Sequence, residues 1–176
     1  DMEEGYPGEL TVKVVYELSE NNELSMVYEA STNKLTIINL TNHTYYNLKG
    51  EGDSTILDHS LQMNAGYFIP VDSTLIPTGQ IAEVDGTPFD FRKAKLISMD
   101  IEADNEQLAF GLGYDHNWVL DKTPGELSLA LKLSDASKGI VMEMYTTEPG
   151  VQFYCGNFMD GTVVGKSGKK YPYRSA

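Results

Sequence analysis

The sequence is poor in cysteine, in histidine and in positive charge, and these shortages exclude several classes of protein. Cys155 is the only cysteine, so the chain forms no internal disulfide and does not require an oxidising compartment. Only 13 Lys and Arg residues stand against 26 Asp and Glu residues, which gives a net charge of −13 at pH 7. Such a chain repels a phosphate backbone or an anionic bilayer, so we expect no nucleic acid and no membrane among its partners.

Long apolar runs are absent as well. No stretch approaches the roughly 18 consecutive apolar residues that a membrane-spanning helix needs, and the acidic first residues are unlike a secretion signal. We therefore expect a cytoplasmic location. Apolar residues make up 41% of the chain and charged residues 22%, values that are typical of a folded globular protein. Because 176 residues suit one domain, residues 1–176 are predicted to form a single domain.

Apolar and polar residues alternate along much of the chain, which is the period of a strand with one wetter face. Residues 10–18 and 23–32 show this pattern on either side of the turn residues Asn21 and Asn22. They are therefore predicted to be adjacent antiparallel strands. The same pattern predicts further strands over residues 35–40 and 55–63, and a hairpin of residues 127–134 and 140–147.

Helical signals are weak. The best candidate, residues 96–108, has an acidic centre and is expected to be short and at the surface. Residues 70–91 contain three prolines and two glycines among apolar residues, which predicts a long packed loop. About a dozen short strands with almost no helix predict an all-β fold, a sandwich of antiparallel sheets.

Three segments contain candidate site residues. Residues 39–48 place His43 at a strand end beside Tyr45, where an imidazole can exchange a proton and an aromatic ring can cover a sugar. Residues 111–118 place Asp115 and Trp118 behind two glycines, and residues 146–158 place Gln152 after a Pro-Gly turn. Each segment also has a purely structural interpretation. In the first, His43 is only hydrogen-bonded at a strand end; in the second, the residues form a turn and Trp118 belongs to the core; in the third, a hairpin points Gln152 to water.

Metal and thiol chemistry have little support. The three histidines, His43, His59 and His116, are separated by 16 and 57 residues, so none has the short spacing typical of a zinc site. We expect no metal, and a metal-dependent hydrolase would require all three histidines to converge. Cys155 lacks the signature of a catalytic nucleophile and is expected to be a buried thiol.

Taken together, the sequence resembles the aldose 1-epimerase, or galactose mutarotase, family. Seven separated blocks carry the resemblance in the family's order, and they span nearly the whole chain. They are residues 4–8, 39–48, 70–72 with 75–79, 86–92, 113–118, 146–154 and 156–158. Cys155, where a threonine is common, is a minor departure.

The resemblance implies a galactose mutarotase-like β-sandwich that interconverts the α and β anomers of a free aldose, such as galactose or glucose, without a cofactor. It assigns the acid that protonates the ring oxygen to His43 and places Tyr45 beside it in the sugar pocket. Asp115 is expected to bind sugar hydroxyls, and Gln152 is expected near the same site. We therefore expect His43, Asp115 and Gln152 to converge on one cleft.

Two elements of the family pattern do not match any segment of this chain. They are an upstream segment with a histidine and an arginine, and a downstream Leu-Glu-Thr-Gln segment with the glutamate base. The resemblance thus implies an incomplete sandwich, a companion chain that carries these flanks, and little activity from these 176 residues alone. The alternative is a non-catalytic carbohydrate-binding module or inactive fragment with the same fold.

Overall fold

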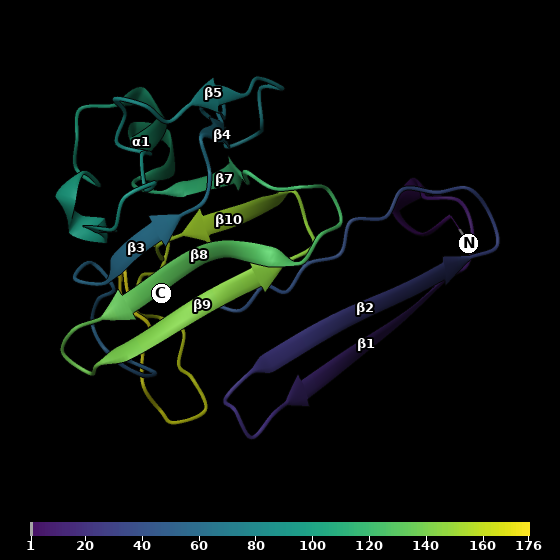
Figure 1. The fold of residues 1–176 in the computed structure, drawn as a ribbon, viewed down its shortest axis with the longest axis horizontal. Helices are drawn as coiled ribbons and strands as arrows, with labels where there is room; N and C mark the ends of the chain where they lie inside the picture. Colours follow the sequence, from purple (N-terminus) through teal and green to yellow (C-terminus); the bar gives the residue numbers. More distant parts are fainter. Residues whose placement is uncertain (1) are drawn as a thin grey trace. The chain divides into compact units, whose positions relative to one another are not determined.

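The computed structural model describes residues 2–176, which divide into two compact units (Figure 1). The first unit ends at Thr44, and the second is Tyr45–Ala176. The prediction that residues 1–176 form a single domain stays a prediction. None of the helices in the described part of the chain is long and apolar enough to cross a membrane.

The first unit is built around one hairpin. After a short 3₁₀ helix, η1 (Glu3–Gly5), strand β1 (Leu10–Leu18) pairs in antiparallel fashion with β2 (Leu24–Thr32). The predicted pair of strands is thereby confirmed. In the turn, Asn22 has a φ of 61°, a left-handed conformation that asparagine tolerates better than most residues.

Residues 35–40 were also expected to form a strand, and this prediction is wrong. The segment has no strand assignment, and Leu35 and Ile37 are exposed. Alternation of apolar and polar residues shows which face a segment would bury, but a strand also requires a neighbour for its backbone N–H and C=O groups.

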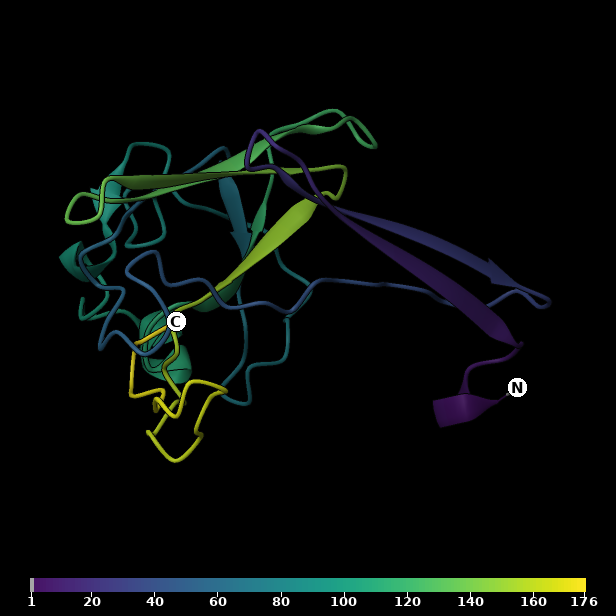
Figure 2. The same cartoon turned by 90° about the horizontal axis from the view of Figure 1, so that it is seen from below.

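The second unit consists of two antiparallel sheets, most of whose strands are labelled in Figure 1, and Figure 2 shows them from below. One sheet has the strand order β6-β3-β8-β9 and the other the order β10-β7-β4-β5. The strands are β3 (Ser60–Met63), β4 (Tyr67–Ile69), β5 (Ala82–Glu83), β6 (Lys95–Leu96), β7 (Asp115–Val119), β8 (Ser128–Asp135), β9 (Ile140–Thr146) and β10 (Gly150–Tyr154). The predicted hairpin of residues 127–134 and 140–147 is present as β8 and β9, whereas the strand predicted over 55–63 is confined to β3.

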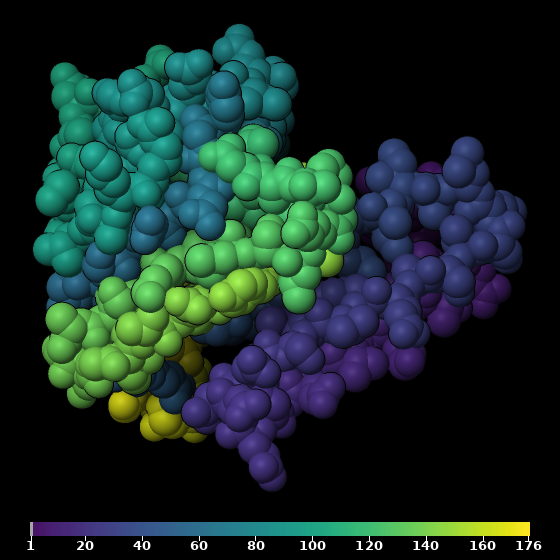
Figure 3. Space-filling model, in the orientation of Figure 1, coloured from purple at the N-terminus to yellow at the C-terminus, as the bar shows by residue number. Residues whose placement is uncertain are grey.

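One hydrophobic core joins the two sheets. Leu61 and Leu131 face it from the first sheet, and Phe68 and Trp118 face it from the second. The loop before β6 contributes Phe89, whose backbone carbonyl accepts a 2.9 Å hydrogen bond from the Trp118 indole. Closely packed atoms of the teal and green segments cover this unit on the face seen in Figure 3. An all-β antiparallel sandwich is therefore confirmed.

The helix predicted over residues 96–108 is wrong in its bounds. The structure has a 3₁₀ turn, η2 (Ile97–Met99), and a separate helix, α1 (Glu106–Gly111). The side chain of Asn105 caps α1 by accepting hydrogen bonds from the backbone N–H groups of Gln107 and Leu108, so the helix begins only after the acidic stretch. The loop predicted over residues 70–91 is present, and it contains the two residues of β5 and an isolated β-bridge between Val71 and Pro77.

Candidate functional site

A pocket of about 180 Å³ lies on the outer face of the sheet that contains β7 and β10. One side of it is polar and the other apolar. The polar lining is Asp115, His116, Asn117 and Gln152, and the apolar lining, from β4 and the loop after it, is Ile69, Val71, Leu75 and Pro77. The volume is below the range of about 300 Å³ and more that is typical for drug-sized ligands, so the pocket suits a small molecule.

Strand pairing brings the polar residues together. Gln152 of β10 lies opposite Asn117 of β7, and Tyr154 lies opposite Asp115. Because side chains alternate along a strand, these residues all project from the same face of the sheet. The side-chain amide of Gln152 donates a 2.9 Å hydrogen bond to Oδ1 of Asp115. Two of the predicted site residues, 37 positions apart in sequence, are therefore in direct contact.

The opposite wall is held in place by a side chain of the helix. The Gln107 amide of α1 bonds the backbone of Val71 twice, since Oε1 accepts from the Val71 N–H at 2.8 Å and Nε2 donates to its carbonyl at 2.9 Å. Asp72 closes the following turn by accepting hydrogen bonds from Thr74 and from the Ile76 N–H. The hydrogen bonds from Thr74 also lower the pKa of Asp72, so this turn contains an ionised carboxylate at neutral pH.

Tyr45 reaches the same face of the sheet. Its ring centroid lies 5.5 Å from that of Tyr154, the residue opposite Asp115. Tyr154 in turn stacks on Phe158 and accepts a hydrogen bond from the Phe158 N–H. The structure thus brings three of the four predicted site residues, Tyr45, Asp115 and Gln152, to one region. The convergence of His43 on this region stays a prediction, because His43 belongs to the first unit.

The two neighbouring ring residues of the same motif are buried: Trp118 belongs to the core, and His116 also lines the pocket. His116 and Trp118 alternate with Asp115 and Asn117 along β7, and both are fully buried. Burial lowers the pKa of His116 to about 4, so its imidazole is neutral at pH 7. Its Nδ1 accepts a 3.1 Å hydrogen bond from the Asp115 N–H. The alternative of a core tryptophan is correct for Trp118.

Cys155 is a buried thiol, as predicted. It is fully enclosed and lies 3.3 Å from the Tyr114 carbonyl, to which it can donate a hydrogen bond. Burial raises its pKa to about 12, which leaves almost no thiolate at neutral pH. The thiol therefore has no part in the chemistry of the pocket.

Sequence reasoning missed Asn117, Tyr154 and the apolar wall. The first two could have been found, because the alternation along β7 and β10 places them on the same face as Asp115 and Gln152. The wall formed by Val71 and its neighbours gave no such signal, since a loop has no period that predicts which side chains face a pocket.

One further group of side chains could hold a metal by composition. Asp58, His59 and Asp135 each offer a ligand atom, and these atoms lie within 4.8 Å of one another. His59 was considered in the sequence only against the other histidines, so the two carboxylates were missed. The hydrogen bond that Nε2 of His59 accepts from the Leu48 N–H does not fit a metal ligand at Nδ1.

Comparisons with known proteins agree with this arrangement. The aldose 1-epimerase family model matches residues 1–175. The galactose mutarotase of Bos taurus is 47% identical over 175 residues, which are 99% of this chain and 49% of that protein. The aldose 1-epimerase of Escherichia coli (strain K12) is 40% identical over 162 residues, which are 92% of this chain and 46% of that protein.

Solved structures give the same result. The GalM/aldose epimerase homologue from C. elegans superposes with a TM-score of 0.84 at 32% identity, over 98% of this chain and 50% of that one. The galactose 1-epimerase from Lactobacillus acidophilus NCFM superposes with a TM-score of 0.82 at 34% identity, over 100% of this chain and 53% of that one. The chain thus spans about half the length of the relatives it matches. By sequence and by fold, it belongs to the aldose 1-epimerase family.

Proposed function

We propose that this chain is part of an aldose 1-epimerase, an isomerase that interconverts the α and β anomers of a free aldose such as galactose or glucose. The observation that carries the proposal is the hydrogen-bonded pair Asp115 and Gln152 in a pocket of about 180 Å³. Support comes from relatives that are named galactose mutarotase and aldose 1-epimerase. With a single cysteine and no disulfide, a reducing compartment such as the cytoplasm is the expected location.

The polar side of the pocket suits sugar hydroxyls. One carboxylate oxygen of Asp115 accepts a hydrogen bond from the Gln152 amide. The other oxygen and the Gln152 carbonyl oxygen are left as acceptors for sugar hydroxyls. The apolar side, which includes Val71 and Leu75, can pack against the C–H groups of the ring. Tyr45 lies against Tyr154 and offers an aromatic edge at the same face of the sheet.

Anomer interconversion requires two proton transfers. A base takes the proton of the C1 hydroxyl, a C1 carbonyl forms, and the bond between C1 and the ring oxygen breaks. The ring oxygen keeps the electron pair of that bond and takes a proton from an acid, for which we propose the imidazolium of His43. Rotation about the C1–C2 bond and the reverse steps then give the other anomer. We assign the base to no residue of this chain.

The test is polarimetry on freshly dissolved α-galactose and α-glucose, with the spontaneous rate in the same buffer as the reference. The protein is used as it is isolated, and its intact mass and that of any companion chain are measured. We expect His43→Ala to lower kcat by about 10²–10⁴-fold, the usual contribution of a positioned acid or base. The matched control is Lys132→Ala, which removes an exposed ion pair with Glu143 on the other sheet.

Each outcome has a clear meaning. Accelerated mutarotation that is lost in His43→Ala and kept in Lys132→Ala supports the proposal. Sugar binding without acceleration, in a preparation that includes any companion chain, would instead indicate a non-catalytic carbohydrate-binding module. Full activity that survives His43→Ala would show that the acid is another residue.

A further inference from the structure

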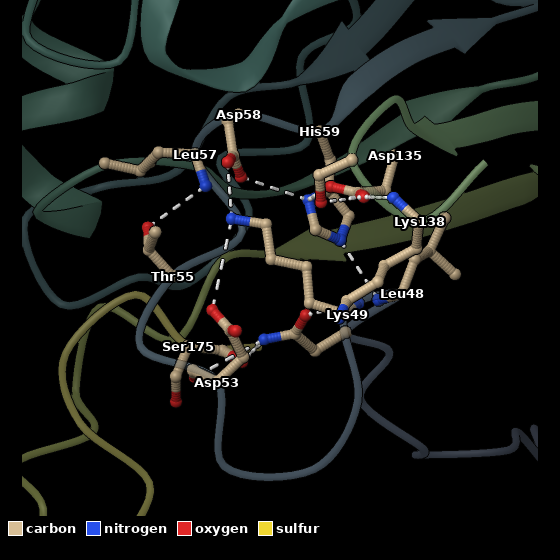
Figure 4. A network of polar contacts seen from close by, with 12 residues as sticks. Leu48, Lys49, Asp53, Thr55, Leu57, Asp58, His59, Asp135, Lys138 and Ser175 are labelled. Carbon is tan, nitrogen blue, oxygen red and sulfur yellow. Dashed lines mark hydrogen bonds and ion pairs between the residues drawn. The ribbon is translucent and has the colours of Figure 1, made fainter. Parts of the chain in front are cut away.

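His59 lies at the centre of a polar cluster in the second unit, together with Asp58, Asp135, Leu48 and Lys49 (Figure 4). It directly precedes β3 and is fully buried. Its Nδ1 makes no hydrogen bond, but it lies 3.5 Å from Oδ1 of Asp58 and 3.6 Å from Oδ2 of Asp135. A hydrogen bond from Ser137 lowers the pKa of Asp135, so at neutral pH this carboxylate is ionised.

The other ring nitrogen of His59 decides the tautomer. Nε2 accepts a 3.0 Å hydrogen bond from the Leu48 N–H, and it needs its lone pair to do so. In the neutral ring, the proton is therefore on Nδ1, where it faces the two carboxylates. Asp58 and Asp135 stabilise this tautomer by their negative charge.

The same hydrogen bond argues against a metal at this cluster. A metal held by Nδ1 needs the lone pair of that nitrogen, and the ring proton would then be on Nε2. There it would point at the Leu48 N–H, so two donors would face each other. In addition, Asp58 already has a resident cation, because the Lys49 ammonium forms an ion pair with it.

Three consecutive residues make polar contacts here, Leu48 through its backbone and Asn47 and Lys49 through their side chains. The Leu48 N–H bonds to His59, the Asn47 side-chain amide donates a 2.9 Å hydrogen bond to the Ser175 carbonyl, and the Lys49 ammonium pairs with Asp58. Asp58 and His59 are neighbours in sequence, so one short segment before β3 holds residues 48 and 49 together. Tyr45, only three positions before Leu48, is the residue whose ring lies 5.5 Å from Tyr154.

We propose that His59 is a positioning residue of the sugar pocket: its Nδ1–H tautomer fixes the Leu48 backbone and thereby holds Tyr45 against Tyr154, beside Asp115. The effect of His59 on sugar binding rests on the proposed function, whereas its effect on Tyr45 does not. His59 touches no sugar in this scheme. It acts through the 45–48 segment alone.

Two amide substitutions form a matched pair for the test. In His59→Gln, the side-chain oxygen reaches the position of Nε2 and can still accept the Leu48 N–H. In His59→Asn, the shorter side chain reaches only the position of Nδ1, so this acceptor is lost. Both substitutions place a neutral amide in the same buried position, and they differ in the one hydrogen bond that the proposal requires.

Nuclear magnetic resonance gives the structural readout. In the unsubstituted protein, we expect a protonated Nδ1 and an unprotonated Nε2 on His59, a slowly exchanging Leu48 amide, and nuclear Overhauser effects between the rings of Tyr45 and Tyr154. In His59→Asn, the Leu48 amide should exchange rapidly and the Overhauser effects between Tyr45 and Tyr154 should disappear. In His59→Gln, both should be as in the unsubstituted protein. Galactose affinity should fall about tenfold in His59→Asn and no more than about threefold in His59→Gln, as expected for the loss of one neutral hydrogen bond.

Several results would overturn the proposal. One is an Nε2–H tautomer in the unsubstituted protein, which is measurable even where a variant does not fold. Another is an unchanged contact between Tyr45 and Tyr154 in a folded His59→Asn variant. A metal that copurifies at one per chain and whose removal by a chelator frees the Leu48 amide would point to a metal site instead. If the unsubstituted protein binds no aldose but the ring contacts respond as expected, the proposed function fails and the positioning role stands.

Discussion

The side-chain amide of Gln152 donates a 2.9 Å hydrogen bond to a carboxylate oxygen of Asp115, which makes one recognition unit of two residues 37 positions apart. The bond orients the glutamine, so that its Nε2 faces the carboxylate and its carbonyl oxygen is turned away from it. The second carboxylate oxygen of Asp115 and the carbonyl oxygen of Gln152 are thereby left as neighbouring hydrogen-bond acceptors at the polar end of the pocket. Adjacent acceptors of this kind match the adjacent hydroxyl groups of an aldose.

Asp115→Asn should weaken sugar binding while the fold is kept. The substitution removes the charge of the acceptor but preserves its shape, and hydrogen bonds to charged groups are worth about 1.5–3 kcal/mol. We expect galactose affinity to fall roughly 10- to 100-fold, as measured by calorimetric titration. Glu83→Gln on β5, which removes an exposed carboxylate of the same sheet outside the pocket, is the control and should bind as before. Equal affinity of the Asn variant would exclude Asp115 from sugar recognition.

The sequence predicted the residues of this pair better than it predicted their surroundings. The resemblance to the family implied that Asp115 and Gln152 lie near one site, and the pairing of β7 with β10 brings them together. The apolar wall is different, because Val71 and Leu75 face the pocket through the path of a loop that no period encodes. The strand expected over residues 35–40 failed for a related reason, since its alternation says nothing about a pairing partner.

The cluster around His59 illustrates a second limit. In a sequence, a metal-binding histidine is recognised by a short spacing to another histidine or a cysteine. His59 has no such residue nearby. Its partners are a neighbouring residue, Asp58, and Asp135 at the end of β8, which pairs with β3. Only the strand pairing brings that second carboxylate to the imidazole. The tautomer depends in turn on the backbone of Leu48, which has no sequence signature at all.

Gln107→Leu should destabilise the second unit and loosen the apolar wall. Val71 is buried, and the substitution leaves its N–H and its carbonyl without the partners that Gln107 provides. We expect the free energy of unfolding, measured by urea denaturation, to fall by roughly 1–3 kcal/mol. Amide hydrogen exchange at Val71 should accelerate in the same variant.

The matched control is Gln80→Leu, in the same loop. Gln80 is exposed, so the same change of side chain there should alter the stability by less than about 0.5 kcal/mol. If both variants have the stability of the unsubstituted protein, Gln107 does not hold the wall.

Acid should destabilise the protein through His116. Burial lowers its folded-state pKa from 6.5 to about 4, so the unfolded chain binds a proton in the pH range in which the folded protein does not. Stability should therefore fall as the pH drops from about 6.5 to 4, by up to about 3 kcal/mol for this group. The carboxylates of Asp72 and Asp135, whose pKa values are lowered by hydrogen bonds from Thr74 and Ser137, add their own loss only below about pH 4.

His116→Asn is the informative variant. An asparagine oxygen can occupy the position of Nδ1 and accept the Asp115 N–H, but the side chain does not titrate. Urea unfolding at several pH values should show a less stable variant at pH 7 with a flatter profile between pH 6.5 and 4. A slope in this range equal to that of the unsubstituted protein would assign the acid sensitivity to other groups.

The Cys155 thiol should react only when the protein unfolds. The side chain is fully enclosed and its pKa is raised to about 12, so both access and thiolate formation are suppressed in the folded state. With a disulfide reagent at pH 8, we expect labelling to be slow in buffer and to rise to one thiol per chain across the urea transition. Cys155→Ser supplies the blank, because no other cysteine is present. Rapid labelling of the folded protein would mean that the region around Tyr114 and Cys155 opens independently of global unfolding.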